Sequence, residues 1–250
     1  MKLMENRIFE TITSDLAAME NEYRLEARLE MYSCKTGTSD ERKAYKSFVS
    51  TSASSTPNKA KEYLGPPDSL ALHSSTSTSP RHSVGGNGSQ CEANSPLCDT
   101  INKKTFWYLV ATLNASYGMD ADFSDVRSQM FSREPSVEWV MDRINTNFTT
   151  VLGAEYEKLR PFVWKAIDEQ ITLRDCTVYS FSPDVSYDPY ANEHNLWKFW
   201  YLFYNPTLKR VCFFQCRAVK NGTDALAWED EDSFVMEEDA GYYSRTISTA

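Results

Sequence analysis

Histidine is the side chain most often used for acid–base chemistry, and this sequence has only three, His73, His82 and His194. A Ser-His-Asp or Cys-His site needs a histidine that is held in position as a base. His73 and His82 lie in a segment rich in Ser, Thr and Gly, and His194 lies among turn-forming residues. Histidines in such settings are usually solvated, so the sequence predicts no catalytic residue and no histidine-based zinc site.

Carboxylates offer the main alternative chemistry. Asp168 and Glu169 are adjacent in a predicted helix, and Asp184 lies in a predicted loop. Two such groups could form a glycosidase pair or a divalent-metal site. Solvated helix and turn positions are the simpler explanation, because Asp in a turn commonly hydrogen-bonds its own backbone. A small intracellular hydrolase that uses Asp168, Glu169 or Asp184 is therefore the alternative function.

Cys212 and Cys216 share one face of a predicted strand, as two metal ligands could. Their spacing is not that of a zinc knuckle, and Phe214 lies between them. Burial as small apolar side chains is the simpler interpretation. The six cysteines include no close CxxC pair and the N-terminus lacks a secretory signal, so we expect reduced thiols and no cofactor.

Composition and charge argue against several classes of partner. The net charge is −9, and seven acidic residues lie between Glu229 and Asp239, so the rest of the chain is close to neutral. No run of basic residues forms a nucleic-acid-binding stripe, and no apolar run reaches the roughly 20 residues of a membrane helix. We expect a monomer inside the cell that binds neither nucleic acid nor membranes directly.

The elements that must position these residues centre on two runs, 196–204 and 211–217, which are dense in aromatic and β-branched residues. The turn-forming residues between them, Asn205-Pro206-Thr207-Leu208, predict a β-hairpin. Alternate residues of the first run fall on opposite faces, and both faces are apolar apart from Lys198. Such a strand must be covered on both sides, so the hairpin is predicted to be the middle of a layered core that buries Trp200.

Hydrophobic periodicity predicts the remaining elements. A helix over 9–19 and a strand over 25–32 precede helices over 106–118, over 134–152 with Ser132 as its N-cap, and from Pro161 to about Ile171. A strand over 176–181 and a loop over 182–195 lead into the hairpin. We predict an α/β fold: a single globular domain with a mainly antiparallel sheet covered by helices on both faces. The early strand should pair with the C-terminal strands.

A long disordered insertion is predicted to interrupt this domain. Residues 1–35 and 101–220 form the domain, residues 36–100 form the insertion, and residues 221–250 form an acidic disordered tail. Ser, Thr, Gly, Pro and Asn dominate the insertion, which cannot bury enough surface to offset its ordering entropy. Within it, 42–49 could form a transient helix, whereas the glycines over 85–88 lack the flanking strand and helix of a phosphate-binding loop.

The insertion also carries candidate phosphorylation sites. Thr56, Ser79 and Ser95 each precede a proline, and Ser83 follows Arg81 by two positions. A disordered segment can enter a kinase cleft without unfolding the domain, and each phosphate adds about −1.5 to −2 charge. We therefore predict regulatory phosphorylation at one or more of these four residues.

Three blocks of the chain carry a more specific pattern. The first is LEMYSCK over 29–35. The second joins YLVATLN over 108–114 with DFS over 122–124 and FSREPS over 131–136, and the third joins WKAIDE over 164–169 with the hairpin. In these blocks, their order, the insertion and the acidic tail, the chain resembles the Maf-one family of eukaryotic repressors of RNA polymerase III. It departs from that family's Pro-Asp-Tyr-Asp-Phe-Ser at Met119 to Ser124, which puts a partner contact through Ala121 in doubt, and Gln170 replaces a usual acidic residue.

The resemblance implies a protein-binding repressor and not an enzyme. Such proteins bind the clamp region of RNA polymerase III and prevent its engagement with initiation factor IIIB, including the TFIIB-related subunit. Synthesis of transfer RNA and 5S ribosomal RNA then falls in stress or starvation. Kinases of the TOR and cyclic-AMP pathways are expected to restrain the repressor, which should shuttle between nucleus and cytoplasm with its phosphorylation state. The candidate partner-surface residues are basic side chains, although solvated strand ends also explain them: Lys35, Lys198, Lys209 and Arg210.

Overall fold

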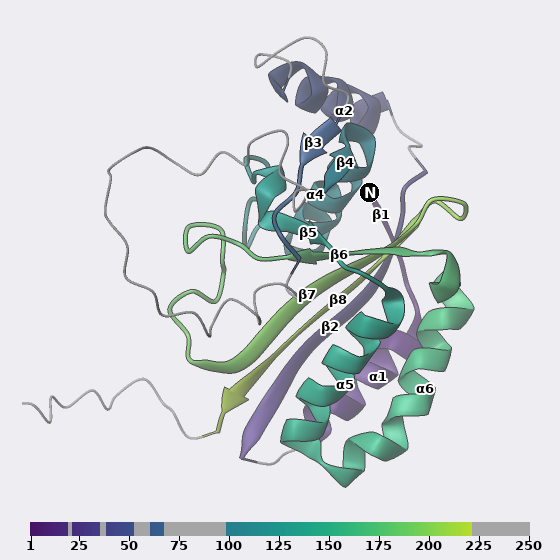
Figure 1. Ribbon diagram of the computed structural model, residues 1–250, viewed down its shortest axis with the longest axis vertical. Coiled ribbons are helices and arrows are strands. Elements are labelled where there is room, and N and C mark those ends of the chain that lie inside the picture. The colour runs from purple at the N-terminus through teal and green to yellow at the C-terminus, as the bar shows by residue number, and fades with distance from the viewer. Residues whose placement is uncertain (20–21, 36–38, 53–60, 68–98, 222–250) are drawn as a thin grey trace, which may run out of the picture.

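The computed structural model describes residues 1–19, 22–35, 39–52, 61–67 and 99–221 (Figure 1). Its main element is a six-stranded sheet in which every neighbouring pair is antiparallel. The strands follow one another across the sheet in the order β1 (Lys2–Met4), β2 (Tyr23–Ser33), β8 (Arg210–Lys220), β7 (Asn195–Asn205), β6 (Thr177–Phe181) and β5 (Phe131–Arg133). The predicted α/β fold with a mainly antiparallel sheet is thus confirmed.

The predicted hairpin forms the middle of the sheet as β7 and β8, and its two faces enter two separate cores. Trp197, Phe199, Tyr201 and Phe203 pack on one side, and Trp200, Leu202 and Tyr204 pack on the other. Trp200 is 4% exposed, and its Nε1 donates a hydrogen bond to the hydroxyl of Tyr117 (2.8 Å). Asn205 closes the turn, because its Oδ1 accepts from the backbone N–H groups of Thr207 and Leu208.

The N-terminal strand pairs with the C-terminal strand, as predicted. All eleven residues of β2 face partners in β8, from Tyr23 opposite Lys220 to Ser33 opposite Arg210. Residues from the two ends of the chain therefore lie side by side at the centre of the domain. The insertion does not prevent this, because the cost of closing a loop grows only slowly with its length.

Helices α1 (Arg7–Ala18), α5 (Val137–Leu152) and α6 (Ala154–Ile171) cover one face of the sheet (Figure 1). α5 starts later than predicted, because Ser136 and not Ser132 is its N-cap and accepts from the N–H of Trp139 (3.1 Å). α6 starts earlier than predicted and contains Pro161. Its first two turns bury Tyr156 completely, so tertiary packing outweighs the local signal of the proline.

Helix α4 (Lys103–Tyr117) covers the other face and buries Phe106, Leu109 and Leu113 there. α2 (Ser39–Ser52) lies against α4, and β3 (Lys61–Tyr63) pairs with β4 (Thr100–Asn102) in a second small sheet. Short 3₁₀ turns at Ser128–Met130 and Leu173–Asp175 lead into β5 and β6. Helices on both faces of the sheet, as predicted, make it a buried layer.

Two stretches inside the predicted insertion have regular structure. The possible transient helix over 42–49 is part of α2, and residues 61–67 dock on the domain. Leu64 is fully buried, and the N–H of Gly65 donates to the carbonyl of Phe131 (2.8 Å). The four candidate phosphorylation sites and the acidic tail lie outside the described residues. Within those residues, none of the helices has the length and apolar character that crossing a membrane requires.

Candidate functional site

Of the three carboxylates of the alternative hydrolase function, Asp184 lies far from the other two. Asp168 Oδ1 accepts from the N–H of Leu173 (2.8 Å) at the end of α6, and Glu169 lies 3.9 Å from Lys165 on the exposed side of that helix. Asp184 follows the far end of β6, where its carbonyl accepts from the N–H of Tyr187. The length of β6, on the order of 15 Å, separates Asp184 from the others, whereas a glycosidase pair needs about 5–10 Å.

Cys212 and Cys216 are core residues. Both are completely buried on the face of β8 that packs against α5 and α6, among Phe199, Phe203 and Phe214. Burial raises the pKa of each thiol well above its usual value, so both stay neutral. Among the residues that the structure describes, no three His, Cys, Asp or Glu side chains are grouped as metal ligands would be.

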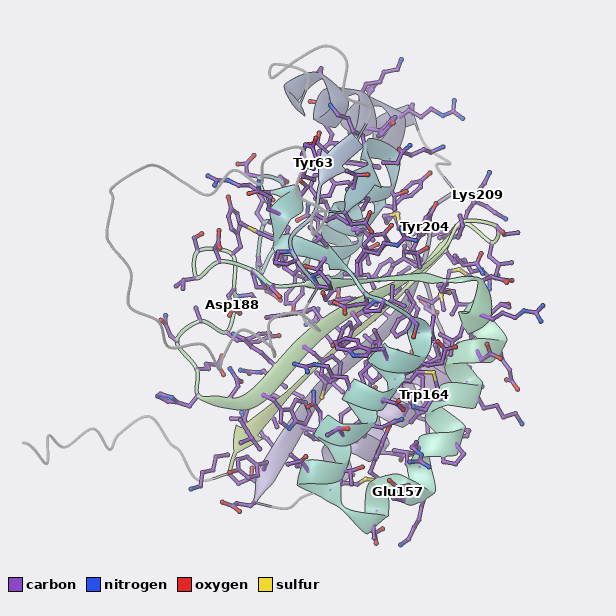
Figure 2. All side chains as sticks on the ribbon, viewed as in Figure 1. Tyr63, Glu157, Trp164, Asp188, Tyr204 and Lys209 are labelled. Atoms are coloured by element: carbon purple, nitrogen blue, oxygen red, sulfur yellow. The ribbon has the colours of Figure 1, made fainter. Side chains whose placement is uncertain are left out.

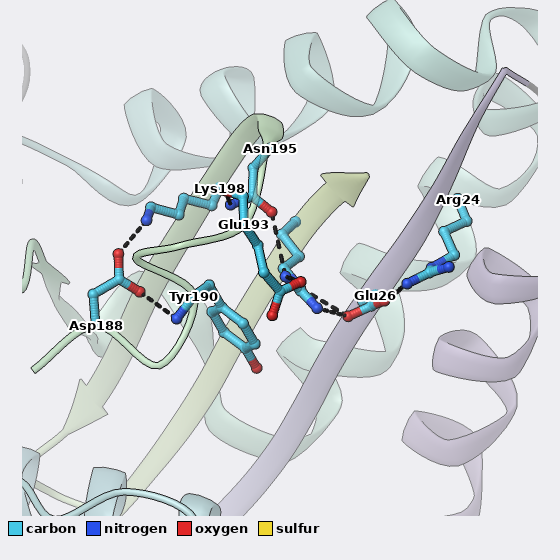
Figure 3. A network of polar contacts seen from close by, with 8 residues as sticks. Arg24, Glu26, Asp188, Tyr190, Glu193, Asn195 and Lys198 are labelled. Carbon is cyan, nitrogen blue, oxygen red and sulfur yellow. Dashed lines mark hydrogen bonds and ion pairs between the residues drawn. The ribbon is translucent and has the colours of Figure 1, made fainter. Parts of the chain in front are cut away.

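A polar network occupies the other face of the sheet where α4 ends. Its centre is Arg217, a residue that sequence analysis did not single out and whose side chain is only 6% exposed. Arg217 Nε donates to Glu26 Oε2 (2.7 Å) on β2, and Nη1 forms an ion pair with Glu193 (Figure 3). The guanidinium carbon lies 4.0 Å from the centre of the Tyr190 ring, in a cation–π contact. An arginine inside a mostly apolar strand run was the only signal for this network in the sequence.

The network ties the loop after β6 to the sheet. Asp188 forms an ion pair with Lys198, and its other oxygen accepts from the N–H of Tyr190 (2.9 Å) (Figure 3). Burial alone would raise the pKa of Glu26, but hydrogen bonds and charges from Arg217 and Arg24 outweigh it and hold that pKa below its usual value. Burial likewise opposes the charge of Arg217, and the hydrogen bonds to Glu193 and Glu26 raise its pKa. Each charge in this network is balanced by an opposite charge of the same molecule. We call the network the clamp; its members are Glu26, Asp188, Tyr190, Glu193, Lys198 and Arg217.

The four basic partner-surface candidates fall at two separate places. Lys198 belongs to the clamp, whereas the other three meet at the turn of the hairpin, about 23 Å away along β7. There the N–H of Cys34 donates to the carbonyl of Lys209 (2.8 Å), and Ser33 pairs with Arg210. Figure 2 shows Asp188, the partner of Lys198, and Lys209 at opposite ends of the sheet.

Lys2 joins this group, because β1 sets it opposite Ser33. We call Lys2, Lys35, Lys209 and Arg210 the basic end. Arg210 is partly occupied, since its Nη1 donates to the carbonyl of Gln170 (2.7 Å) at the end of α6. The three lysines are exposed, and none of them forms an ion pair with a carboxylate of the described residues. Sequence analysis missed Lys2 because three residues are too few to predict β1.

Known proteins resemble this chain in sequence and in fold. The Maf1 regulator family model matches residues 25–215. The chain is 32% identical over 213 residues to a Schizosaccharomyces pombe protein named repressor of RNA polymerase III transcription maf1, a match covering 85% of this chain and 81% of that protein. It is 33% identical over 124 residues to a Dictyostelium discoideum protein named repressor of RNA polymerase III transcription, covering 50% of this chain and 44% of that one.

A crystal structure of citrus MAF1 has the same fold. It aligns with a TM-score of 0.55 at 24% identity, over 86% of this chain and 99% of that one. The family match spans most of the sheet and all of α4, α5 and α6. The resemblance found in three separate blocks of sequence is therefore confirmed, and the chain belongs to the Maf1 regulator family.

Proposed function

We propose that this chain represses transcription by RNA polymerase III: it binds the polymerase and prevents its engagement with initiation factor IIIB. Synthesis of transfer RNA and 5S ribosomal RNA then falls. The observation that carries the proposal is the family match over residues 25–215, together with relatives that are named as repressors of this polymerase. The separated carboxylates and the internally matched charges of the clamp agree with a binding role.

The basic end is the surface that we assign to the polymerase. Its three exposed lysines sit at the ends of β1, β2 and the hairpin turn, so the central sheet holds them in place. They form no ion pair with the described carboxylates, and they could therefore face an acidic partner surface without first breaking a contact. Complementary charge of this kind speeds association and suppresses wrong partners.

The test is the double variant Lys35→Glu/Lys209→Glu. We expect about a tenfold or greater loss in the amount of RNA polymerase III captured from nuclear extract, with a parallel loss of repression in a transcription assay. The matched control is Lys158→Glu/Lys165→Glu, which makes the same change in charge on exposed residues of α6. Failure of the wild-type chain to enrich the polymerase contradicts the proposed function. Equal capture by wild type and the double variant moves the contact to another surface.

Phosphorylation of the insertion is the proposed off-switch, with Thr56, Ser79, Ser83 and Ser95 as sites for kinases of the TOR and cyclic-AMP pathways. Several phosphates would make the insertion strongly acidic. Changing Ser79, Ser83 and Ser95 together to Ala should give a more nuclear and more repressive protein, and changing them to Asp the reverse. Localisation imaging and a transcription assay check this. Identical behaviour of the Ala and Asp forms would rule these three residues out as the control point.

A further inference from the structure

Within the part of the chain that the structure describes, strand β2 leaves most of its outer edge unpaired. β8 lies along its inner side for the whole strand, but β1 pairs on the outer side only with Met31 to Ser33. From Tyr23 to Glu30, no described strand pairs with that edge. The free backbone N–H and C=O groups of such an edge are a template for another strand.

The side chains of this edge alternate between two kinds. Arg24, Glu26, Arg28 and Glu30 lie on the face that α4 partly covers, where Glu26 contacts Arg217 and where Arg28 and Glu30 contact Ser116 of α4. Leu25, Ala27 and Leu29 lie on the other face, where they pack with α1. Positive and negative charges thus alternate strictly along one face of the free edge.

We propose that two copies of this chain associate through antiparallel pairing of these edges, with the two-fold axis at Ala27. In this register Arg24 lies opposite Glu30 of the second copy, and Glu26 lies opposite Arg28 of the second copy. Symmetry repeats both pairs, so four opposite-charge pairs form on one face. Directly opposite charges of this kind stabilise a sheet, and a two-fold axis closes the assembly at two copies.

Neighbouring registers are disfavoured by the same charges. An axis at Glu26 would set that residue opposite itself and Arg24 opposite Arg28, and an axis at Arg28 would set Glu26 opposite Glu30. Like charges directly opposite each other destabilise a sheet. The free length accommodates this register, because Arg24 to Glu30 is symmetric about Ala27 and the next residue, Met31, already pairs with β1.

Space and bonding capacity are both available at the edge. A hollow of about 250 Å³ adjoins it, lined by residues of β1, α1 and β2 that include Leu3, Phe9, Ala27 and Leu29, and Leu3 is 48% exposed there. The charged residues of the edge can form further hydrogen bonds besides their present ones, because a carboxylate accepts several hydrogen bonds and a guanidinium donates five.

Seven residues from each copy make a small interface, so the dimer should be weak and sensitive to salt. It replaces the expected monomer only at high protein concentration.

The decisive measurement is the mass of the full chain by sedimentation equilibrium, at low ionic strength and over increasing concentration. We expect the mean mass to rise from 28.6 kDa toward twice that value. Arg24→Glu, at an exposed residue, places like charges opposite each other at two symmetric positions and should weaken the dimer at least tenfold. Glu30→Lys should do the same. Mixing the two variants restores opposite charges at both positions and should restore a dimer that contains one copy of each.

Lys158→Glu on α6 makes the same change in charge as Arg24→Glu, away from the edge, and should dimerise like the wild type. Circular dichroism would check that each variant is folded. If Glu30→Lys does not fold, since it loses the bonds from Tyr32 and Ser116, then Arg24→Glu alone decides. A wild type that stays monomeric throughout, or an Arg24→Glu variant that dimerises as well as the wild type, overturns the proposal.

Discussion

Arg217 is a charged side chain that the fold keeps almost entirely out of water. It retains its charge because Glu26 and Glu193 approach it from β2 and from the loop before β7, and because the Tyr190 ring lies against it. Removing one partner of such a cluster is costly, since the charges that remain lose their hydrogen bonds while part of their burial persists. The clamp therefore fastens a loop of turn-forming residues to the sheet.

Arg217→Met should lower the free energy of unfolding by about 1.5–3 kcal/mol at neutral pH, the range for hydrogen bonds to charged groups. The lower half of that range is expected, because Glu26 and Glu193 are 35% and 46% exposed and solvent screens them. Urea unfolding measures the loss. Lys158→Met, which breaks an exposed ion pair on α6, should change stability by well under 1 kcal/mol.

The same variant predicts a pH dependence. The pKa of Glu26 in the folded protein lies below the unfolded value of 4.5, so its stabilising contribution is present above that pH and is lost as pH falls through the folded pKa. The stability difference between wild type and Arg217→Met should therefore shrink in acid. A difference that stays constant from pH 7 to about pH 3 would show that packing, and not the ion pair, gives the effect.

At the scale of elements, β2 completes the sheet from the opposite end of the chain. It contributes a full row of pairs to β8, a strand in which nine of eleven residues are buried. Without residues 1–35, which contain α1 as well as β2, both the edge of β8 and the apolar side chains that α1 covers would face water. The N-terminal piece is therefore an integral layer of the domain.

Removing residues 1–35 should give a protein that aggregates, because an unpaired apolar edge recruits other strands. Light scattering and size-exclusion chromatography of the truncated chain check this. Removing residues 68–98, which lie between two docked segments, is the matched control and should leave a soluble protein. A truncated chain that is stable and monomeric without its first 35 residues would contradict the role given to β2.

At the scale of the whole molecule, the sheet separates two apolar cores. The buried residues of the two clusters lie between Phe9 and Ala218. Repulsion among the seven acidic residues from Glu229 to Asp239 opposes packing of the C-terminal tail on either core. Removal of residues 228–250 should therefore shift the melting temperature by less than about 2 °C in a calorimetric scan. A large fall in melting temperature would mean that the tail packs on one of the two cores.

Sequence alone determined the central hairpin, the burial of both its faces, the pairing of the early strand and the family. These features rest on local signals: aromatic and β-branched runs, alternation along a strand, and short sequence blocks that resemble the family. The N-cap of α5 was missed by four residues, because Ser132 and Ser136 are both plausible caps and only the position of β5 separates them.

Only the tertiary structure decided the rest. The local sequence predicts that a helix starts at Pro161. In the structure α6 begins at Ala154 and continues past this proline, because the helix buries Tyr156 and Val163. Residues 61–67 lie in a segment whose composition predicts disorder, but β4 and β5 supply partners from far along the chain. Lys35 and Lys209 meet, Lys198 is clamped elsewhere, and Asp168 and Asp184 stand at opposite ends of β6. Each of these outcomes depends on strand order and register, which are set by contacts between distant residues that no local pattern encodes.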